Sequence, residues 1–582
     1  MNMQGHYFIA VFSVVILLIG CSEKPAPPVT SKTADSAQDQ STNISSDDDM
    51  EAPSGPLYQI CNNPDSLKEE FPSIRDEVLK LVTDFYRENG YQPYWVRGDK
   101  LHGSAFNVVN ALDLAYVHGL DPEDYLSEQL PEILDAFQNT QNEQQPSTLV
   151  RVDLTLTLSV IALAYDLRHG AVLPRNMIRT WTTVKKNFDY QNLMKQIPEK
   201  SLHEILESFA PQHQGYQRLV KALEYYRTLA KKGGWESIDP GHLRGLKDRE
   251  LETGSHILVP LLRKRILAEG YQVDMPEDPE ERHIYDDSLK EAVRKIQANR
   301  GLDPDAIIGP LTIKALNVSV EELIVKIVWS MERWRWLPEA LGERYILVNL
   351  PEFKLRAYSA GDLEIKMGVI VGDSVQGTWS PVFADQMEYV IFRPYWNVPR
   401  SIIKGELLPE IEKDRKYLKK YNYEIVDRFS ADAEVFKPSR GAIKRVKEGE
   451  LQIRQTAGSY NALGLVKFIF PNQYAVYLHD TNQRHLFAHS KRDFSHGCIR
   501  VQNPEGLAHF ALKNRTWSNE RIHEAMYKGE RQLVRVGQPI PVYIFYLTAC
   551  ATDRGEERPI AFFEDLYRYD VKVPELKTAS TH

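Results

Sequence analysis

Cysteine is scarce in this sequence, which holds only four among 582 residues, at positions 21, 61, 498 and 550. So few thiols in so long a chain exclude a disulfide framework, and each cysteine needs its own explanation. An excess of positive charge is also missing, because the formal net charge is -9. That balance argues against nucleic acid as the main partner. The HExxH and Cys-x-x-Cys patterns that often signal zinc are absent as well.

The composition is otherwise that of a globular protein, with 42% hydrophobic and 26% charged residues. A chain of this length is too long for one hydrophobic core, so about three or four domains are expected. The charges are mixed along the chain, which fits a soluble surface.

The N-terminus carries an export signal over residues 1–21. Phe8 to Ile19 is almost continuously apolar but too short to span a membrane. The following "LIGC" resembles the cleavage box of bacterial lipoproteins, in which the cysteine, here Cys21, becomes lipidated. The segment before it, "MNMQGH", has no Lys or Arg, so an uncleaved anchor or a plain signal stays open. With Ser22 next, the resemblance implies the periplasm of a Gram-negative bacterium and an outer-membrane anchor.

Residues 22–56 are rich in Ser, Asp, Thr, Pro and Gln and contain almost no large apolar residue. Such a segment cannot bury enough surface to offset the entropy lost on ordering. We expect a disordered linker that tethers the folded part.

Residues 57–265 show helical patterns and no repeat of fixed period. In "RDEVLKLVTDFYREN" the apolar Val78, Leu81, Val82 and Phe85 recur at helical spacing. The more apolar "DLTLTLSVIALAYDLRHG" predicts a buried helix that ends at Gly170. We expect a helical domain here, with packing as its main role.

Residues 266–325 contain "DSLKEAVRKIQANRGLDPDAIIGPLTIKALN", which predicts two helices joined by a turn-rich link. The pattern resembles the small three-helix peptidoglycan-binding module. A module kept only as a structural spacer is the alternative. The matching positions are Gln297, Gly301, Leu302, Asp305, Gly309, Thr312 and Leu316.

Residues 326–575 predict a mainly β domain, because short β-branched and aromatic runs such as "YILVNL" recur between Pro and Gly. Residues 405–445 interrupt these runs with a charged, helix-like stretch that is poor in strand signals. It is expected to be an insertion over the sheet, either a capping lid or a solvated pair of surface helices. The predicted fold class is therefore multidomain α+β.

The segment "YLHDTNQRHLFAHSKRDFSHGCIRVQNP" concentrates the reactive side chains of the β domain. Cys498 after Gly497 suits a thiol nucleophile, because glycine permits a tight turn whose N–H groups can approach an oxyanion. His479, nineteen residues upstream at the end of a strand-like run, can serve as its base. Asp480 can orient that imidazole through its backbone carbonyl or its carboxylate.

Zinc binding is the competing interpretation of the same segment. His485 and His489 are four residues apart, a spacing that would place both on one helix face. The basic residues between them and Cys498 would repel a cation, so no metal is expected. A structurally buried Cys498 is disfavoured because its polar and glycine neighbours make a poor core strand.

The arrangement "HD…FSHGCIRV" resembles the signature of the L,D-transpeptidases, cysteine acyltransferases of bacterial cell walls. "PYWNVPRSI" around Trp396 and "VGDSVQGTWSP" also resemble that family. In the second motif Trp379 and Ser380 separate Thr378 from Pro381, where the family usually has a Thr-Pro step. Together with the helical region and the binding module, the resemblance covers nearly all of residues 57–575. It is specific to the large periplasmic subclass with a helical scaffold and a capping insertion.

The resemblance assigns roles to individual residues. Cys498 would be the nucleophile, His479 the base, the Asp480 backbone carbonyl its partner, and the amides at Gly497 and Cys498 the oxyanion site. Ser495, His496, Arg500 and Trp396 would lie along bound substrate. His496 is either a polar group near the thiolate or a loop-packing residue. Basic side chains of the same segment suit a carboxylate-rich substrate or are simply solvated, namely Arg484, Lys491 and Arg492.

The implied reaction joins two stem peptides of peptidoglycan without a cofactor. Cys498 would release D-alanine from a tetrapeptide donor, and the side-chain amine of a second diaminopimelate would capture the thioester. Three alternatives remain: the same site could hydrolyse the thioester, it could attach a protein to the cell wall, or the protein could be a non-catalytic wall-binding lipoprotein. Cys61 and Cys550 lie in different predicted domains, and we expect two buried free thiols.

Overall fold

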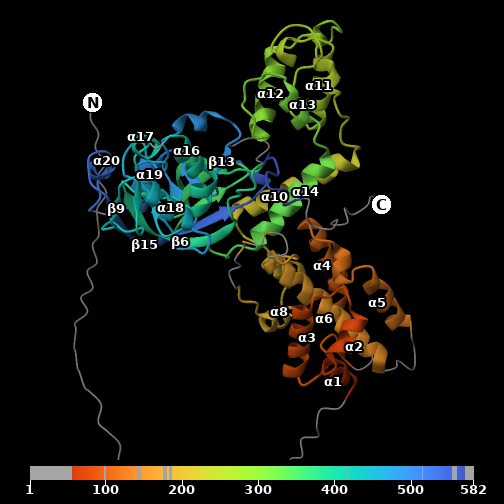
Figure 1. The fold of residues 1–582 in the computed structure, drawn as a ribbon. Coiled ribbons are helices and arrows are strands. Elements are labelled where there is room, and N and C mark those ends of the chain that lie inside the picture. Colours follow the sequence, from red (N-terminus) through yellow and green to blue (C-terminus); the bar gives the residue numbers. More distant parts are fainter. Residues whose placement is uncertain are drawn as a thin grey trace, which may run out of the picture. The chain divides into compact units, whose positions relative to one another are not determined.

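The computed structural model describes residues 55–570, except 98–99, 140–145, 175–177, 179, 182–185, 415, 514–515 and 553–559. The predicted signal peptide, the lipidation site Cys21 and nearly all of the linker 22–56 lie outside the described residues. The described part of the chain, coloured by sequence in Figure 1, has helical regions before and a strand-rich region after about residue 340. The predicted multidomain α+β class is confirmed.

The scaffold region is built on α6, which is long and almost wholly apolar. Its stretch Thr148–His169 has the length and hydropathy of a membrane span, yet 78% of that window is buried inside the protein. It is therefore the core helix of the region, as predicted from the sequence. The scaffold helices are α1 (Pro56–Cys61), α2 (Pro64–Glu70), α3 (Asp76–Glu88), α4 (Phe106–Val117), α5 (Gln129–Asn139), α6 (Pro146–His169), α8 (Tyr190–Gln196), α9 (Leu202–Glu207) and α10 (Gln214–Lys231), and a short hairpin joins β1 (Val96–Arg97) to β2 (Lys100–Leu101).

A buried carboxylate on α6 holds the "YQPYWV" segment in place. Asp153 accepts hydrogen bonds from the backbone N–H groups of Tyr94, Trp95 and Val96, at 3.0, 2.7 and 3.1 Å. The Tyr86 hydroxyl donates to the same carboxylate at 2.5 Å. These bonds give this stretch a structural role, because each partner is an internal backbone or side-chain group.

The second region has a core of its own, formed by buried residues from Ile238 to Leu316. Its helices are α11 (Leu258–Ala268), α12 (Asp287–Asn299) and α13 (Pro310–Leu316). The boundary expected at residues 265/266 falls inside α11, whose buried side chains belong to this core. Gly301, with φ +70°, follows the end of α12 as the sequence predicted.

The sequence pattern of this region is a buried hydrogen-bond network. Gln297 donates through Nε2 to Asp305 Oδ1 at 2.9 Å and to Thr312 Oγ1 at 3.2 Å, and its Oε1 accepts from Ala306 N at 2.9 Å. Gln297 is 2% exposed. These three pattern positions therefore hold the turn between α12 and α13, whatever the outer surface of the module binds.

Helix α14 (Val320–Arg335) leads into the strand-rich region and contacts α10 and α6 of the scaffold. The boundary expected at residues 325/326 falls within this helix. Scaffold residues and residues of the strand-rich region form one apolar cluster, to which α14 contributes Leu323, Ile327 and Met331. The scaffold thus shares its core with the strands that follow.

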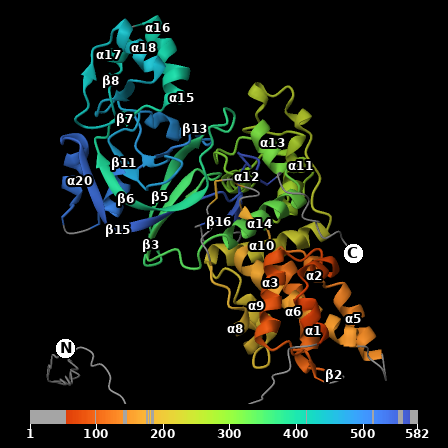
Figure 2. The ribbon, with the colours of Figure 1, turned by 60° about the horizontal axis from the view of Figure 1, so that its bottom comes forward.

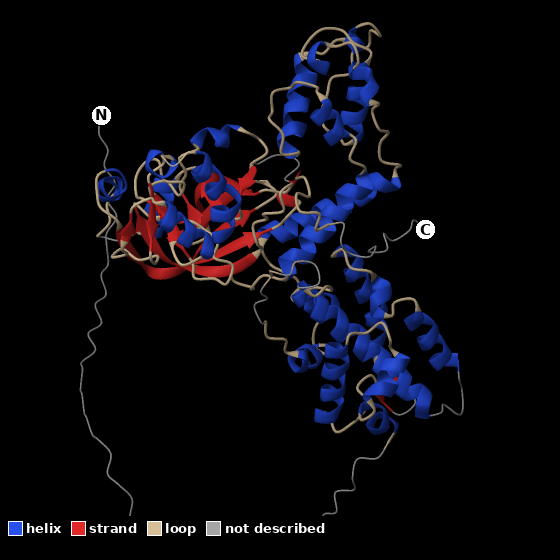
Figure 3. Ribbon diagram, viewed as in Figure 1, coloured by secondary structure: helices blue, strands red, loops and turns tan. Residues whose placement is uncertain are grey.

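The strands of the strand-rich region gather into one body (Figure 3). Among the described residues nine of them form the main sheet, in the order β13-β5-β14-β12-β11-β6-β15-β3-β4. Because β4 also pairs with β5, the sheet closes on itself. Its strands are β3 (Arg344–Asn349), β4 (Lys354–Ser359), β5 (Asp362–Gly372), β6 (Phe383–Phe392), β11 (Val466–Ile469), β12 (Leu478–His479), β13 (Asp493–Ser495), β14 (Ile499–Val501) and β15 (Gln532–Phe545). The same region also contains two helices, α19 (Pro504–Ala511) and α20 (Asn519–Tyr527), and a separate pair of strands, β16 (Ala549–Ala551) and β17 (Ile560–Phe562).

The expected insertion forms a capping lobe, defined here as residues 396–455, with its own apolar core (Figure 2). Its strands form a separate sheet in the order β7-β10-β8-β9. The helix-like expectation is therefore incomplete, because runs as short as "YEIV" are too brief for a strand pattern to emerge from the sequence. The lobe contains β7 (Trp396–Asn397), α15 (Arg400–Ile402), the π-helical turn η6 (Ile403–Leu407), α16 (Leu408–Lys413), α17 (Tyr417–Lys420), β8 (Tyr423–Val426), β9 (Val435–Phe436), α18 (Arg440–Glu448) and β10 (Gln452–Gln455).

Candidate active site

Strand register places Cys498 and His479 at diagonal positions of two neighbouring strands. β12 and β14 are parallel neighbours, with Leu478 opposite Ile499 and His479 opposite Arg500. Ile499 N donates to Tyr477 O at 3.1 Å, so Cys498 continues the β14 side of the ladder. Because side chains alternate along a strand, Leu478 and Ile499 face the core, where both are fully buried. Cys498 and His479 therefore share the opposite face of the sheet.

The imidazole of His479 is oriented by a backbone carbonyl. His479 Nδ1 lies 2.5 Å from Asp480 O, and a carbonyl can only accept, so Nδ1 carries the proton and Nε2 is left as the basic nitrogen. The Asp480 carboxylate is used elsewhere: it accepts from Leu465 N at 2.8 Å and from Arg484 at 2.7 Å. Of the two partners left open by the sequence, the structure has the backbone carbonyl in contact with the ring.

Burial, followed by the positive charges of Arg500 and Lys467, lowers the pKa of His479 to about 3, against the opposing effect of the Asp480 carbonyl. The ring, 4% exposed, is consequently neutral near pH 7. A neutral imidazole with a free Nε2 is the form that can accept a proton from a thiol.

The Cys498 thiol is half-buried, and its Sγ lies 3.9 Å from Ala475 O. Burial raises its pKa. The Tyr477 backbone N–H and the charge of Lys467 act in the opposite direction, followed by the Tyr477 hydroxyl and Arg500. The site therefore combines desolvation of the sulfur with a set of groups that stabilise its ionised form.

The loop before Cys498 is held by Ser495 and glycine. Gly497 has φ +110°, which favours glycine over other residues. Its N–H donates to Ser495 Oγ at 3.2 Å, and the Ser495 hydroxyl donates to Cys498 O at 2.6 Å. The expectation of a free Gly497 amide therefore needs correction, because that N–H is already used inside the loop. Within the described part of the chain, the Cys498 N–H has no acceptor and is the amide available to an oxyanion.

A second loop, residues 373–381, supports this turn and was not assigned a role from the sequence. Ser380, fully buried, donates through Oγ to Gly497 O at 2.7 Å and accepts from Gly372 N at 2.9 Å. Thr378 Oγ1 donates to Ser495 O at 2.9 Å. The Trp-Ser step that separates Thr378 from Pro381 thus supplies a side chain that holds the loop before Cys498.

The expected substrate-binding residues lie in different environments. Ser495 is buried within the loop. His496 Nε2 donates to Glu406 of η6 at 2.8 Å, so it contacts the capping lobe. Arg500 donates to Gln483 at 2.7 Å, and half-buried Trp396 packs against the core of the capping lobe. His496 therefore joins the Cys498 loop to the capping lobe, and Trp396 is part of that lobe.

The other predicted polar residues of the segment have partners within the protein or are exposed. Arg484 binds Asp480, Lys491 lies 3.2 Å from Glu564, and Arg492 donates to backbone carbonyls that include His489 O, at 2.7 Å. His485 and His489 are exposed. Across the described ranges, no group of three or more His, Cys, Asp or Glu is arranged to hold a metal ion. Cys61 and Cys550 are buried thiols, and neither forms a disulfide.

Two further residues on the Cys498 face were missed, Lys467 of β11 and Tyr477. Lys467 Nζ lies 3.8 Å from the centroid of the Tyr477 ring. Burial and the neighbouring Cys498 raise the pKa of Tyr477 well above its usual range. A lone lysine in the apolar run "LVKFIF" was the available signal, since it must leave the core face of that strand.

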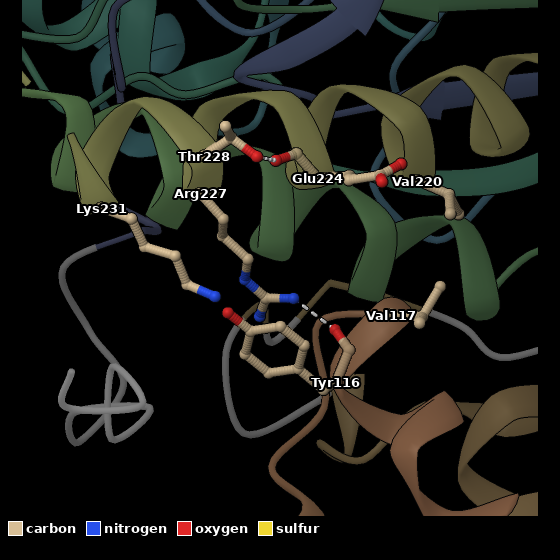
Figure 4. A pocket seen from close by; sticks show the side chains of 7 residues that line it. All are labelled: Tyr116, Val117, Val220, Glu224, Arg227, Thr228 and Lys231. Atoms are coloured by element: carbon tan, nitrogen blue, oxygen red, sulfur yellow. Dashed lines mark hydrogen bonds between the residues drawn. The ribbon is translucent and has the colours of Figure 1, made fainter. Parts of the chain in front are cut away.

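A separate cavity of about 410 Å³ lies between α4 and α10 (Figure 4). The Arg227 guanidinium lies 3.5 Å from the Tyr116 ring centroid and donates to the Tyr116 carbonyl. The lining residues belong to the scaffold, and the cation Arg227 among them already contacts Tyr116. This cavity is distinct from the Cys498 site.

Comparison with known proteins identifies the regions. Residues 343–542 match the family described as "L,D-transpeptidase catalytic domain", residues 255–316 match "Putative peptidoglycan binding domain", and residues 80–223 match "Scaffold domain". The strand-rich region is therefore an L,D-transpeptidase catalytic domain. The chain joins it to a peptidoglycan-binding domain and a scaffold domain.

A curated relative from Haemophilus influenzae, described as "Putative L,D-transpeptidase", is 32% identical over 249 residues. The match covers 43% of this chain and 48% of the relative, so the chain spans about half the length of that relative. A crystal structure of an L,D-transpeptidase from Xylanimonas cellulosilytica is 14% identical and has a TM-score of 0.17, with coverage of 51% of this chain and 97% of that one.

Proposed function

We propose that this protein forms cross-links between the diaminopimelate residues of two peptidoglycan stem peptides, through a thioester on Cys498. The observation that carries the proposal is the pairing of β12 with β14, which puts a thiol and a neutral imidazole on one face of the sheet. The L,D-transpeptidase and peptidoglycan-binding domains support peptidoglycan as the substrate.

In the first half-reaction, His479 Nε2 takes the Cys498 proton and the sulfur attacks the carbonyl between an L-configured centre of diaminopimelate and D-alanine. The S–C bond forms, and the Cys498 N–H donates to the oxygen that becomes negative. The C–N bond then breaks, and the imidazolium returns its proton to the departing D-alanine amine.

In the second half-reaction, the side-chain amine of another stem peptide attacks the thioester. His479 takes the amine proton, a new C–N bond forms, and the C–S bond breaks to release the thiolate. Proton return to sulfur restores the resting site. Each step uses residues of the chain, and the reaction needs no oxidant or external energy source because one amide replaces another.

The decisive experiment incubates the purified protein with disaccharide-tetrapeptide fragments and follows products by mass spectrometry. We expect free D-alanine together with dimers, and loss of both in Cys498→Ala. Cys550→Ala, which changes a buried thiol in β16, is the matched control and should keep activity. Dimers from the Cys498→Ala variant would refute the proposal, and D-alanine release without dimers would establish hydrolysis as the reaction instead.

We also propose export to the periplasm of a Gram-negative bacterium and lipidation at Cys21, with an outer-membrane anchor. The support is the apolar run Phe8 to Ile19 followed by "LIGC". Expression of the full chain in a Gram-negative host, with mass analysis of the N-terminal peptide, tests it. A diacylated Cys21 is expected, and an intact residue 1–21 segment would overturn the assignment.

A further inference from the structure

Lys467 stands on the same face of the sheet as the candidate nucleophile and base. On β11 it lies directly opposite His479 of β12, and paired residues of adjacent strands project to the same side. Its ammonium lies over the Tyr477 ring, 3.8 Å from the centroid. Tyr477 in turn contacts the His479 ring edge-on at 5.6 Å. Lys467 is thus connected to the Cys498 site through its contact with the Tyr477 ring and its pairing with His479.

The side chain of Lys467 is partly buried, and none of the described residues gives it a carboxylate partner. Within the residues that the structure describes, its Nζ takes part in no hydrogen bond or ion pair, and the Tyr477 ring is its contact. Burial lowers the pKa of Lys467 to about 8, and the nearby Arg531 acts in the same direction, while Cys498 opposes them. An ammonium in such a place is costly, and groups shifted by burial and by a specific charged partner concentrate at functional sites.

The charged and titratable groups that face Cys498 come from three strands. β11 supplies Lys467, the β12 side supplies Tyr477 and His479, and β14 supplies Arg500. His496 is adjacent in sequence but binds Glu406 of the capping lobe. The described groups that face the sulfur therefore include two cations and no carboxylate.

The position of Lys467 has opposite consequences for the two reacting side chains. Its positive charge favours a negative sulfur on Cys498 and opposes a positive ring on His479. Arg500 acts in the same way but is also tied to Gln483, at 2.7 Å. Lys467 lacks such a tie, and its effect on Cys498 precedes that of Arg500.

We propose that Lys467 is a positioning residue of the transfer reaction, which acts through its charge to stabilise the Cys498 thiolate and to keep His479 neutral before it takes the thiol proton and again after D-alanine has left. The inference rests on the proposed function only in taking Cys498 as the nucleophile. In this role Lys467 supplies a fixed counter-charge to the sulfur, in addition to the imidazolium that forms during the first half-reaction. His479 is then unprotonated when a stem-peptide amine arrives with its own proton to lose.

The test measures the alkylation rate of Cys498 by iodoacetamide in the full chain between about pH 5 and pH 10, with the modified peptide quantified by mass spectrometry. Thiolate is the reactive form, so the midpoint of the rate profile reports the ionisation of Cys498. Lys467→Met should move the midpoint upward by at least about one pH unit, which slows alkylation at neutral pH about tenfold. Lys467→Arg keeps a positive charge and should stay close to wild type.

Lys186→Met is the matched control. Lys186 is another partly buried lysine, and burial also lowers its pKa to about 8, but its Nζ donates to backbone carbonyls at Arg168 and Arg335. This substitution should destabilise the scaffold and leave the Cys498 profile unchanged.

Two outcomes would overturn the role of Lys467: an unshifted profile in a folded Lys467→Met protein, or a Lys467→Arg profile shifted as far as that of Met. If Lys467→Met fails to fold, Lys467→Gln, which also removes the charge, takes its place in the same comparison. The alkylation assay needs no peptide substrate. A shifted profile in a protein that makes no dimers therefore refutes the proposed function and leaves the Lys467 inference standing, and dimer formation with an unshifted profile does the reverse.

Discussion

Ser380→Ala should weaken the nucleophile loop more than its small change in volume suggests. The hydroxyl is fully buried and connects two backbone groups, the Gly497 carbonyl at 2.7 Å and the Gly372 N–H at 2.9 Å. Alanine leaves both of them without this partner. Each buried polar group that loses its hydrogen bond costs about 1–3 kcal/mol, so the loop should lose about 2–4 kcal/mol against local opening.

The substitution should also slow the chemistry. The C=O and N–H of one trans peptide unit point in opposite directions, so the bond from Ser380 to the Gly497 carbonyl also aims the Cys498 N–H. A misplaced oxyanion donor costs about 100-fold in rate, and we expect the turnover number for D-alanine release to fall by about 10- to 100-fold.

Hydrogen exchange of the peptides that contain residues 369–372 and 493–501 measures the opening free energy, and D-alanine release measures turnover. Ser330→Ala is the control, because Ser330 is equally buried and its Oγ accepts from Ala549 N at 2.9 Å, away from the Cys498 loop. It should destabilise its own surroundings and keep turnover. Equal turnover in the Ser380 and Ser330 variants would refute the reasoning.

Lys467→Met should stabilise the folded protein at pH 7 while it impairs the site. The drop in the lysine pKa from 10.5 to about 8 corresponds to about 3 kcal/mol, which we reduce to about 1–2 kcal/mol because the side chain is partly exposed. The unfolded state binds the proton more tightly, so the wild type recovers this stability as the pH rises from about 8 to 10.5. The difference in melting temperature between the variant and the wild type should therefore narrow over that range, and a constant difference would contradict the argument. Gly464→Ala should reduce turnover at least about tenfold, because a Cβ at this position, with φ +59°, would lie 2.3 Å from the Asp480 carboxylate. Gly361→Ala is the control, because Gly361 also has a positive φ, +88°, but a Cβ there meets open space. Similar turnover in the two variants would be evidence against the steric explanation. Gln297→Ala should lower the protection of residues 286–316 from hydrogen exchange by about 3 kcal/mol and leave turnover on soluble fragments intact. Unchanged protection would show that the buried Gln297 amide does not hold the turn between α12 and α13.

Local patterns were enough to predict the fold class, the long buried helix and the placement of Cys498 and His479. The helical period of "RDEVLKLVTDFYREN" leads to α3, in which Val78, Val82 and Phe85 are buried. His479 ends a strand, as its position after "QYAVYL" indicated. These features depend on neighbours in the sequence, and therefore the sequence shows them directly.

The residues that were missed depend on long-range pairing. Lys467 meets His479 because β11 pairs with β12, and Ser380 meets Gly497 across 117 positions of the chain. No periodicity within either segment contains that information. The expected limits of the second region fall inside α11 and α14 for a similar reason, since only packing shows that α11 lies with α12 in one core.

The parallel pairing of β12 with β14 has a consequence for how this site can vary. The sequence interval between His479 and Cys498 does not set their distance, because the ladder between Leu478 and Ile499 does so. The intervening chain, which carries η7 (Arg484–Ala488), is a crossover whose ends are fixed by the sheet. Insertions or deletions in that crossover can therefore reshape the rim of the site while the reacting pair keeps its geometry, so the segment is a natural place to graft new substrate preferences.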